Sequence, residues 1–440
     1  MYNSPLNRRD VLHLGIACGA SLLAPFRSDN PSQSLKSEAT VISQFPALAQ
    51  TINNTRLIYF DTAATAQRPR QVIDAVTDFY RHDNANPASN LHSLAKRSFE
   101  IYERARATVA SFIGSKDPLE IVWTRGTTEG INLVASTWGE ENIERRDEIV
   151  LTTAEHASNM LPWQLLAKRK GATVRYAEVL DNGELDIASL RRLLSKKTKL
   201  VCFSHVSNVL GIINPAAEIC RIARDAGAKV LIDAAQSVPH IPVDVQKLGC
   251  DFLAFSSHKI MGPMGVGVLW VRRSILDQMP PYQSGSNMAH ARSGEDWEYS
   301  EAARKFSAGT PNVCGPVGLA AAIEFIGTLG YEQMWTHEQE LTRYLLEVLS
   351  QQRGVRLVGG RETQNRISLF CFTTDSTEPE ELARRLDQYG IAIRAGDMAA
   401  LPLLERFGVK RAARASLYVY NTTQEIDEFA RRLGLILKTG

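Results

Sequence analysis

Two stretches of sequence decide the fold: Val230-Leu231-Ile232-Asp233-Ala234-Ala235-Gln236, and Asp251-Phe252-Leu253-Ala254-Phe255-Ser256-Ser257-His258-Lys259. Each contains an apolar run of strand length that passes directly into polar residues. A short apolar run without alternation is typical of a strand buried on both faces, as in a parallel sheet. Ligands of such sheets bind beyond the carboxyl ends of the strands. The polar residues that follow each run are therefore candidates for a functional site.

The sequence around these stretches alternates short apolar runs with amphipathic segments. The expected strands are Glu148–Thr152, Thr173–Val179, Lys199–His205, Lys229–Asp233, Phe252–Ser256 and Val266–Val271. Helical patterns, Ser158–Lys170 and Pro215–Ala226, lie between them. This alternation predicts an α/β domain over residues 41–310, with a mostly parallel sheet covered by helices on both faces.

The pattern changes after Gly309, and residues 311–440 are expected to form a smaller α+β domain. A long helical region is predicted over Val317–Gln352. The remaining expected elements are strands at Val355–Val358, Arg366–Phe372, Ala392–Arg394 and Ala415–Tyr420, a helix at Pro379–Tyr389, and a closing helix capped by Thr422 or Thr423.

The composition excludes several classes of function. The chain has 440 residues, of which 44% are hydrophobic, and its 50 basic and 48 acidic residues leave a net charge of +2. That balance gives no reason to expect nucleic acid as a partner. The six cysteines have no metal-binding or redox spacing, so no metal site is expected.

The N-terminus has the order of a twin-arginine export signal. Arg8 and Arg9 precede an apolar run from Leu14 to Ala24, which is too short to span a bilayer. We expect residues 1–26 to be this signal and residues 27–40 a linker, with the twin-arginine translocase as a partner and the periplasm as the destination. The alternative is a buried or frayed N-terminal helix. Because this pathway moves folded proteins, an exported enzyme can acquire a cofactor before transport.

Lys259 and Asp233 form the first chemical pair. A carboxylate at a strand end needs a partner, and a protonated pyridine nitrogen is one. A lysine that forms a Schiff base, together with an aspartate on the pyridine nitrogen, is the pairing that pyridoxal 5'-phosphate (PLP) chemistry requires.

Two further segments have a functional and an ordinary interpretation. Arg125-Gly126-Thr127-Thr128-Glu129-Gly130 opens a helical pattern, so it either cups an anion at the helix N-terminus or simply caps the helix. His156 begins the helix after Glu148–Thr152, so it either caps that helix or stacks on a planar cofactor.

Here the sequence resembles the group II cysteine desulfurases and selenocysteine lyases, which are class V aminotransferases of the fold-type I PLP enzymes. The likeness runs from about Phe45 to Ile436, with the motifs in family order. The segments that carry it are Asp61–Ala64, Arg125–Asn132, Glu155-His156, His205–Gly211, Asp233–Gln236, Ser256–Lys259, Ala308–Pro311 and Arg414–Leu417.

The resemblance implies PLP as cofactor and a role for each site residue. Lys259 would hold PLP, Asp233 would keep the ring nitrogen protonated, His156 would stack on the ring, and Gln236 would reach the phenolic oxygen. Thr127, Thr128, Ser256 and His258 would hold the phosphate, with Thr310 supplied by the second subunit of a homodimer. Arg414 would bind the substrate α-carboxylate, assisted by Asn208, with Arg394 and His92 also on the substrate side.

The sequence departs from the family in the substrate half of the site. Desulfurases carry a nucleophilic cysteine after an Arg-x-Gly-His-His stretch, whereas this chain has Arg394-Ala395-Gly396-Asp397-Met398-Ala399. Ala399 takes the place of the nucleophile, and an alanine cannot accept sulfur.

We therefore expect an exported PLP enzyme that acts on an amino-acid or peptide-siderophore substrate without persulfide chemistry. The combination of export signal, desulfurase-like motifs and missing cysteine resembles the periplasmic PLP enzymes of pyoverdine maturation, which modify a glutamate side chain. The alternative is a cysteine desulfurase or selenocysteine lyase. A third possibility is a catalytically silent scaffold, which the set of Lys259, Asp233, His156 and Arg414 disfavours.

Overall fold

The computed structural model describes residues 38–88, 91–293 and 296–439. The predicted export signal and most of the predicted linker lie outside these residues. The linker was expected to reach residue 40, but helix α2 (Glu38–Ile42) already includes its last three residues.

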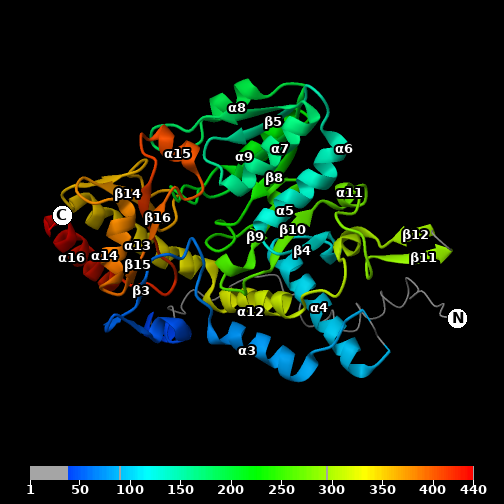
Figure 1. Ribbon diagram of the computed structural model, residues 1–440, viewed down its shortest axis with the longest axis horizontal. Helices are drawn as coiled ribbons and strands as arrows, with labels where there is room; N and C mark the ends of the chain where they lie inside the picture. The colour runs from blue at the N-terminus through cyan, green and yellow to red at the C-terminus, as the bar shows by residue number, and fades with distance from the viewer. Residues whose placement is uncertain (1–37, 89–90, 294–295, 440) are drawn as a thin grey trace. The chain divides into compact units, whose positions relative to one another are not determined.

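A seven-stranded sheet forms the centre of the large lobe (Figure 1). Its strands, in spatial order, are β4 (Ile121–Thr124), β10 (Gly267–Val271), β9 (Phe252–Ser256), β8 (Lys229–Asp233), β7 (Thr198–Ser204), β5 (Glu148–Thr152) and β6 (Thr173–Ala177). β10 pairs antiparallel with β4 and with β9, whereas the other neighbouring strands of this sheet pair in parallel. The prediction of a mostly parallel sheet is therefore confirmed.

The central strands are buried on both faces, as their apolar sequences predict. Every residue of β5, β8 beyond its first, β9 and β10 is buried. Large side chains of the covering helices pack against one face of this sheet. Trp163 and Leu166 of α7 (Leu161–Lys170) are among them. Helix α9 (Ala216–Asp225) packs against β8, and α5 (Thr127–Val134) packs against β9 and β10.

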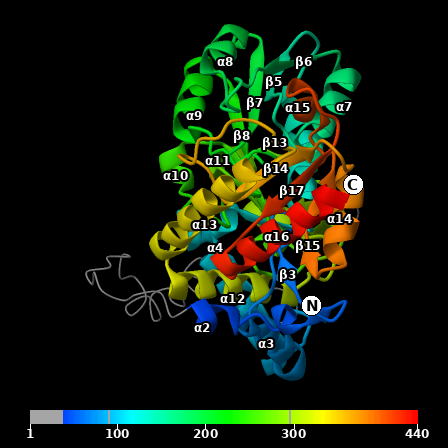
Figure 2. The same ribbon diagram turned by 90° about the vertical axis from the view of Figure 1, so that its left-hand side faces the viewer.

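The small lobe is built on a four-stranded antiparallel sheet. Its strands, in spatial order, are β13 (Val355–Leu357), β14 (Leu369–Thr374), β17 (Ala412–Ser416) and β16 (Arg394–Gly396). Helices α13 (Tyr331–Gln351), α14 (Pro379–Asp387) and α16 (Thr423–Thr439) cover it (Figure 2). Thr422 Oγ1 accepts from the Glu425 N–H, so Thr422 is the cap of the closing helix.

The N-terminal part of the chain contacts both lobes. Strand β3 (Ile58–Tyr59) pairs in parallel with β15 (Ile391–Ala392) of the small lobe. Helices α3 (Arg70–Asp78) and α4 (Ser93–Phe112) pack against α12 (Cys314–Leu329). The predicted domain boundary near residue 310 therefore falls just before a helix that packs on the large lobe.

The helical region predicted over Val317–Gln352 is confirmed, and it consists of two helices. α12 and α13 meet at Gly330 with a bend of 78°. Gly330 has a φ of +78°, a conformation that glycine adopts without steric cost and that ends an α-helix. The bend lets one helix pack on each lobe.

Several predicted boundaries shift in the structure. The pattern at Ser158–Lys170 splits into a 3-10 turn (Ala157–Asn159) and α7, because Pro162 fits the first turn of a helix better than its interior. The strands expected at Arg366–Phe372 and Ala415–Tyr420 are β14 and β17, each displaced by about three residues. No single helix within the described residues is long and apolar enough to cross a membrane; α12 and α13 together pass that test only as a bent pair.

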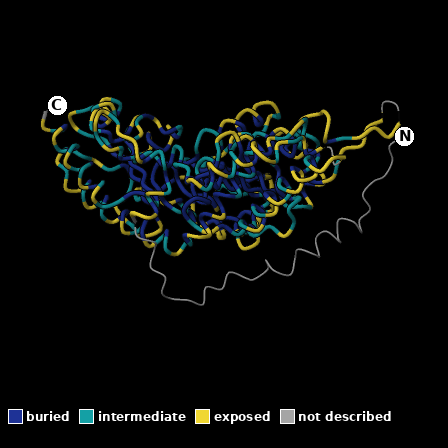
Figure 3. Tube along the Cα trace, turned by 90° about the horizontal axis from the view of Figure 1, so that it is seen from below, coloured by how far each residue is buried: buried dark blue, intermediate teal, exposed yellow. Residues whose placement is uncertain are grey.

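A hairpin of β11 (Ala289–Ser293) and β12 (Asp296–Tyr299) extends from the large lobe with almost all of its residues exposed (Figure 3). Elsewhere, buried segments run through the interior of both lobes.

Gly267 permits a close approach that places the start of α5 on the sheet. A Cβ at Gly267 would lie 2.5 Å from Gly126 Cα, closer than atoms can pack. We expect Gly267→Ala to lower the free energy of unfolding by about 1–3 kcal/mol, because the loop before α5 must move. Urea denaturation would measure this. Gly327→Ala is the control, since a Cβ there meets nothing within 4 Å and the position lies inside α12. Equal stability changes in the two variants would contradict the packing argument.

Candidate functional site

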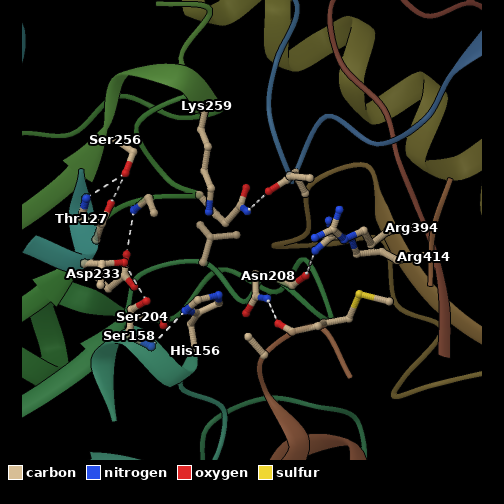
Figure 4. A pocket seen from close by; sticks show the side chains of 18 of the residues that line it. Thr127, His156, Ser158, Ser204, Asn208, Asp233, Ser256, Lys259, Arg394 and Arg414 are labelled. Carbon is tan, nitrogen blue, oxygen red and sulfur yellow. Dashed lines mark hydrogen bonds between the residues drawn. The ribbon is translucent and has the colours of Figure 1, made fainter. Parts of the chain in front are cut away.

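A cavity of about 390 Å³ lies where the carboxyl ends of the central strands face the small lobe. Figure 4 shows Lys259 extending into it from the large lobe, and Arg394 and Arg414 entering from the small lobe. All predicted site residues except Thr310 and His92 line this cavity: Thr127, Thr128, His156, Asn208, Asp233, Gln236, Ser256, His258, Lys259, Arg394 and Arg414.

Thr310 and His92 lie elsewhere in the chain. Thr310 Oγ1 is 3.2 Å from Asn86 Nδ2, in a separate surface pocket beside Tyr80 and Cys314. His92 caps α4, where its Nδ1 accepts from the Ala95 N–H. His92 therefore does not line the cavity of its own chain, and its assignment to the substrate side stays a prediction. The role of Thr310 across a subunit boundary stays a prediction.

Lys259 ends a short 3-10 turn that continues directly from β9. Burial lowers the pKa of its amine to about 8, an effect that Asp233 opposes and Arg414 reinforces. An amine with a pKa near neutrality is available as the free base, which is the form that attacks a carbonyl carbon.

The start of α5 and the end of β9 form a cup of hydrogen-bonding groups. The Thr127 N–H donates to Ser256 Oγ at 2.8 Å, and the two hydroxyl oxygens are 2.7 Å apart. Thr128 Oγ1 lies 2.8 Å from Ser158 Oγ. Backbone N–H groups at a helix N-terminus and clustered hydroxyls are the donor set of a phosphate site. Of the two interpretations open for this segment, the geometry favours the anion cup.

Asp233 and Gln236 follow β8 and are both buried. Asp233 Oδ1 accepts from the Ala235 N–H at 2.9 Å, which fixes the carboxylate at the cavity. The Gln236 amide was expected to point toward a cofactor oxygen, but its Nε2 donates to the Ala63 backbone oxygen at 2.8 Å.

The surroundings of His156 favour its neutral form. Burial, followed by the nearby charge of Lys259, lowers the pKa of its imidazole. Its Nδ1 accepts from the Ser158 N–H at 3.1 Å, so it both caps the 3-10 turn and lines the cavity.

Glu155 is a structural residue that the sequence predictions did not assign. Its fully buried carboxylate accepts from the Ser204 N–H and hydroxyl and from Asn159 Nδ2, at 2.6–3.1 Å, and from the Thr152 hydroxyl. Burial raises its pKa to about 7, against the effect of these hydrogen bonds. Glu155 thereby joins the turn that carries His156 to the end of β7. Its position beside His156 was the only signal in the sequence.

Asp61 is the second unassigned residue. Its carboxylate lies 3.3 Å from Arg414 Nη2 and 3.8 Å from Arg394 Nη1. Burial raises the pKa of Asp61, while the two guanidinium groups oppose that shift. Arg414 is nearly fully buried and also donates to the Asn208 backbone oxygen at 2.9 Å. Its Nε is buried and has no hydrogen-bond partner within the part of the chain that the structure describes.

Ala399 lies in the wall of the cavity. The described part of this wall contains no cysteine. Cys371 is the nearest cysteine in sequence, but it lies inside β14, opposite Arg414, where burial raises its pKa to about 12. A thiol in that state is a poor nucleophile.

The described residues contain no group of three or more histidine, cysteine, aspartate or glutamate side chains arranged for a metal ion. The candidate site is therefore built from a lysine, two arginines and an anion cup.

Comparisons with known proteins agree with this arrangement. The family described as "Aminotransferase class-V" matches residues 58–429. A probable cysteine desulfurase of Halalkalibacterium halodurans is 44% identical over 389 residues, covering 88% of this chain and 95% of the relative. A cysteine desulfurase of Salmonella agona is 42% identical over 396 residues, covering 89% and 96%.

Solved structures show the same fold. The cysteine desulfurase CsdA of Escherichia coli superimposes with a TM-score of 0.84 at 35% identity, covering 91% of this chain and 98% of that one. The apo cysteine desulfurase of Thermococcus onnurineus NA1 gives 0.87 at 35% identity, covering 93% and 100%. A C-DES variant, solved with glycine covalently linked to its PLP cofactor, gives 0.76 at 26% identity, covering 89% and 98%.

Glu155→Gln tests how the His156 turn is held. The amide would place an NH2 group, with two hydrogens to donate, among groups that donate, so we expect a loss of about 1–3 kcal/mol in unfolding free energy at pH 4.5. The folded pKa of Glu155 lies above that of the unfolded chain. The contribution of Glu155 to the free energy of unfolding is therefore full below about pH 4.5, and it is lost as the pH rises through about 7.

The difference between wild type and variant should consequently narrow between pH 4.5 and 7, measured by urea denaturation at several pH values. Glu141→Gln is the control, because Glu141 is exposed and has no side-chain partner among the interactions of the structure. A pH-independent difference would contradict the burial of a titrating carboxyl group.

Proposed function

Because the chain belongs to the class V aminotransferase family, within its cysteine desulfurase group, we propose that it is a PLP enzyme that acts on an amino-acid substrate without a persulfide step. The observation that carries this proposal is Ala399, which lines the cavity and stands at the position that the sequence resemblance assigns to the desulfurase nucleophile. The coarser statement, a PLP-dependent enzyme of this family, follows from the comparisons.

The cavity fits PLP through its donor set. When bound, PLP supplies an electron sink that stabilises negative charge at the substrate α-carbon. Thr127, Thr128, Ser256 and His258 would hold the phosphate, and Thr310 would join them from the second subunit of a homodimer. His156 would lie against the ring.

Asp233 would hold a proton on the ring nitrogen, because an adjacent carboxylate favours the protonated pyridine. Lys259 would hold the cofactor covalently. Once the substrate amino group has taken its place on the cofactor, the freed Lys259 amine would be the group that moves a proton at the substrate α-carbon. Gln236 supports the cavity wall, because its side-chain amide holds the Ala63 segment in place.

The substrate would bind through its α-carboxylate. Arg414 is buried and lines the cavity, so its guanidinium is a desolvated cation that an incoming carboxylate would pair with. Arg394 is about half exposed and only loosely paired with Asp61, so it offers a second cation at the cavity mouth. A glutamate side chain, free or on a peptide siderophore, is a substrate that two such cations suit.

Lys259→Ala should abolish turnover and the visible absorbance of lysine-bound PLP, because no other described lysine lines the cavity. The purified variant would be assayed by absorbance and by mass spectrometry of amino-acid products. Lys305→Ala is a control outside the cavity, and it should keep the absorbance. Turnover retained in Lys259→Ala would refute the assignment.

The second candidate is a cysteine desulfurase or selenocysteine lyase. The names of the relatives favour it. The cavity wall disfavours cysteine as a substrate, because sulfur removal needs a thiolate to receive the sulfur and Ala399 has none. Selenocysteine cleavage depends less on that nucleophile. Release of sulfide from cysteine and of selenide from selenocysteine would be assayed with and without free thiol. Either product would indicate one of these two reactions rather than the proposed one.

Ala399→Cys should produce no substantial desulfuration of cysteine. Asp397 accepts from the backbone N–H of residue 399, so a thiol there would lie beside a carboxylate that disfavours the thiolate. Alkylation and mass spectrometry would detect a persulfide on the new thiol, with Cys314 as the internal reference. Robust persulfide formation at residue 399 would favour the desulfurase reading.

We also propose export to the periplasm through the twin-arginine pathway, with a role in siderophore maturation. Arg8-Arg9 and the apolar run after them support export. The missing cysteine and the two cavity arginines support a substrate other than cysteine. Incubation with glutamyl peptide siderophores and with free amino acids, read by mass spectrometry, tests the substrate.

Arg8→Lys combined with Arg9→Lys should leave folded, PLP-loaded protein in the cytoplasm, because the paired arginines are the recognised feature of the signal. Cell fractionation followed by absorbance of each fraction would measure this. Arg27→Lys, beyond the apolar run, is the control and should be exported normally. Periplasmic protein in the double variant would show that the N-terminus is used differently.

A further inference from the structure

Asp397, Met398 and Ala399 line the cavity, and together with Ala400 they form the segment 397–400. Met398 and Ala399 both have a φ of +53°, the left-handed region that residues with a Cβ rarely adopt. Two such residues in succession persist only where the surrounding structure enforces them. The contacts of this segment therefore show what holds it.

Two hydrogen bonds to backbone oxygens hold the middle of this segment. Asn208 Nδ2 donates to the Met398 backbone oxygen at 2.9 Å, and the Ala157 N–H donates to the Ala399 backbone oxygen at 2.7 Å. Within the segment, Asp397 Oδ1 accepts from the Ala399 N–H at 2.9 Å. Asn208 was expected to assist with the substrate, but its side-chain nitrogen is used for this wall.

The Met398 side chain supplies the apolar contact. It is 8% exposed and belongs to a buried cluster with Val209, Leu403 and Leu404, while also lining the cavity. One side chain thus connects the wall to the interior of the protein. Dispersion contacts of this kind make a segment rigid because the neighbouring side chains leave it no second position.

We propose that Met398 is a specificity-determining residue: its buried side chain fixes residues 397–400 as a rigid wall, and this wall limits the size of the substrate side chain. The limit on substrate size rests on the proposed function. The rigidity of the wall does not, because it is a property of the protein without a substrate.

Hydrogen exchange tests the wall without any substrate. The Ala157 amide is the reporter, since its hydrogen bond ends on Ala399. In the PLP-loaded enzyme, Met398→Ala should accelerate exchange of this amide at least tenfold, resolved by fragmentation and mass spectrometry. Met398→Gly relieves the backbone strain but removes the anchor, so it should also accelerate exchange. Unchanged or slower exchange in both variants would overturn the proposal.

Amino-acid binding tests the size limit. L-alanine and L-phenylalanine would be titrated into the PLP-loaded enzyme and followed by cofactor absorbance. Met398→Ala should shift the ratio of the two dissociation constants at least tenfold in favour of phenylalanine, whereas Met398→Leu should keep the wild-type ratio. Leu404→Ala is the matched control, because Leu404 is buried in the same cluster but does not line the cavity.

The two experiments separate the two proposals. An unchanged binding ratio in Met398→Ala would overturn the specificity role. Wild-type enzyme that binds neither amino acid would count against the proposed function, and the wall would then be judged on the exchange of the Ala157 amide alone.

Discussion

The buried positive charge of Arg414 is the constraint on which the rest of the cavity depends. A guanidinium removed from water is costly unless charges and hydrogen-bond acceptors compensate it. Asp61 provides the charge from the N-terminal part of the chain, and the Asn208 backbone oxygen provides an acceptor from the loop after β7. Three distant segments must therefore converge before the arginine is stable, and their convergence is what brings the two lobes together around the cavity.

Much of the cofactor half could be predicted from the sequence, because it depends on local features. A residue that follows a buried strand lies at the sheet edge whatever the rest of the chain does, so Asp233 and Lys259 were placed correctly. The substrate half depends on contacts between segments far apart in the chain. Asn208 donates a hydrogen bond to the 397–400 wall, and Gln236 donates one to Ala63. No local sequence pattern encodes either contact.

Two residues were missed for a related reason. Asp61 and Glu155 act through partners rather than through the cavity itself, and neither has a distinctive spacing. The bend at Gly330 is a further feature that the sequence pattern did not predict. Apolar periodicity continues through the glycine, so the pattern predicted a helical region without showing where it divides into two helices.

The pairing of β3 with β15 has a consequence for how the protein is made. Ile58 pairs with Ile391, so the chain's early residues complete a strand pair with residues near its end. A contact of such high sequence separation closes a very long loop and cannot form on the ribosome until nearly the whole chain has emerged. The large sheet can assemble during synthesis, but the arginine of the small lobe reaches Asp61 only afterwards. A chain truncated before β15 would thus keep the Thr127–Ser256 contact and lack the Asp61–Arg414 ion pair.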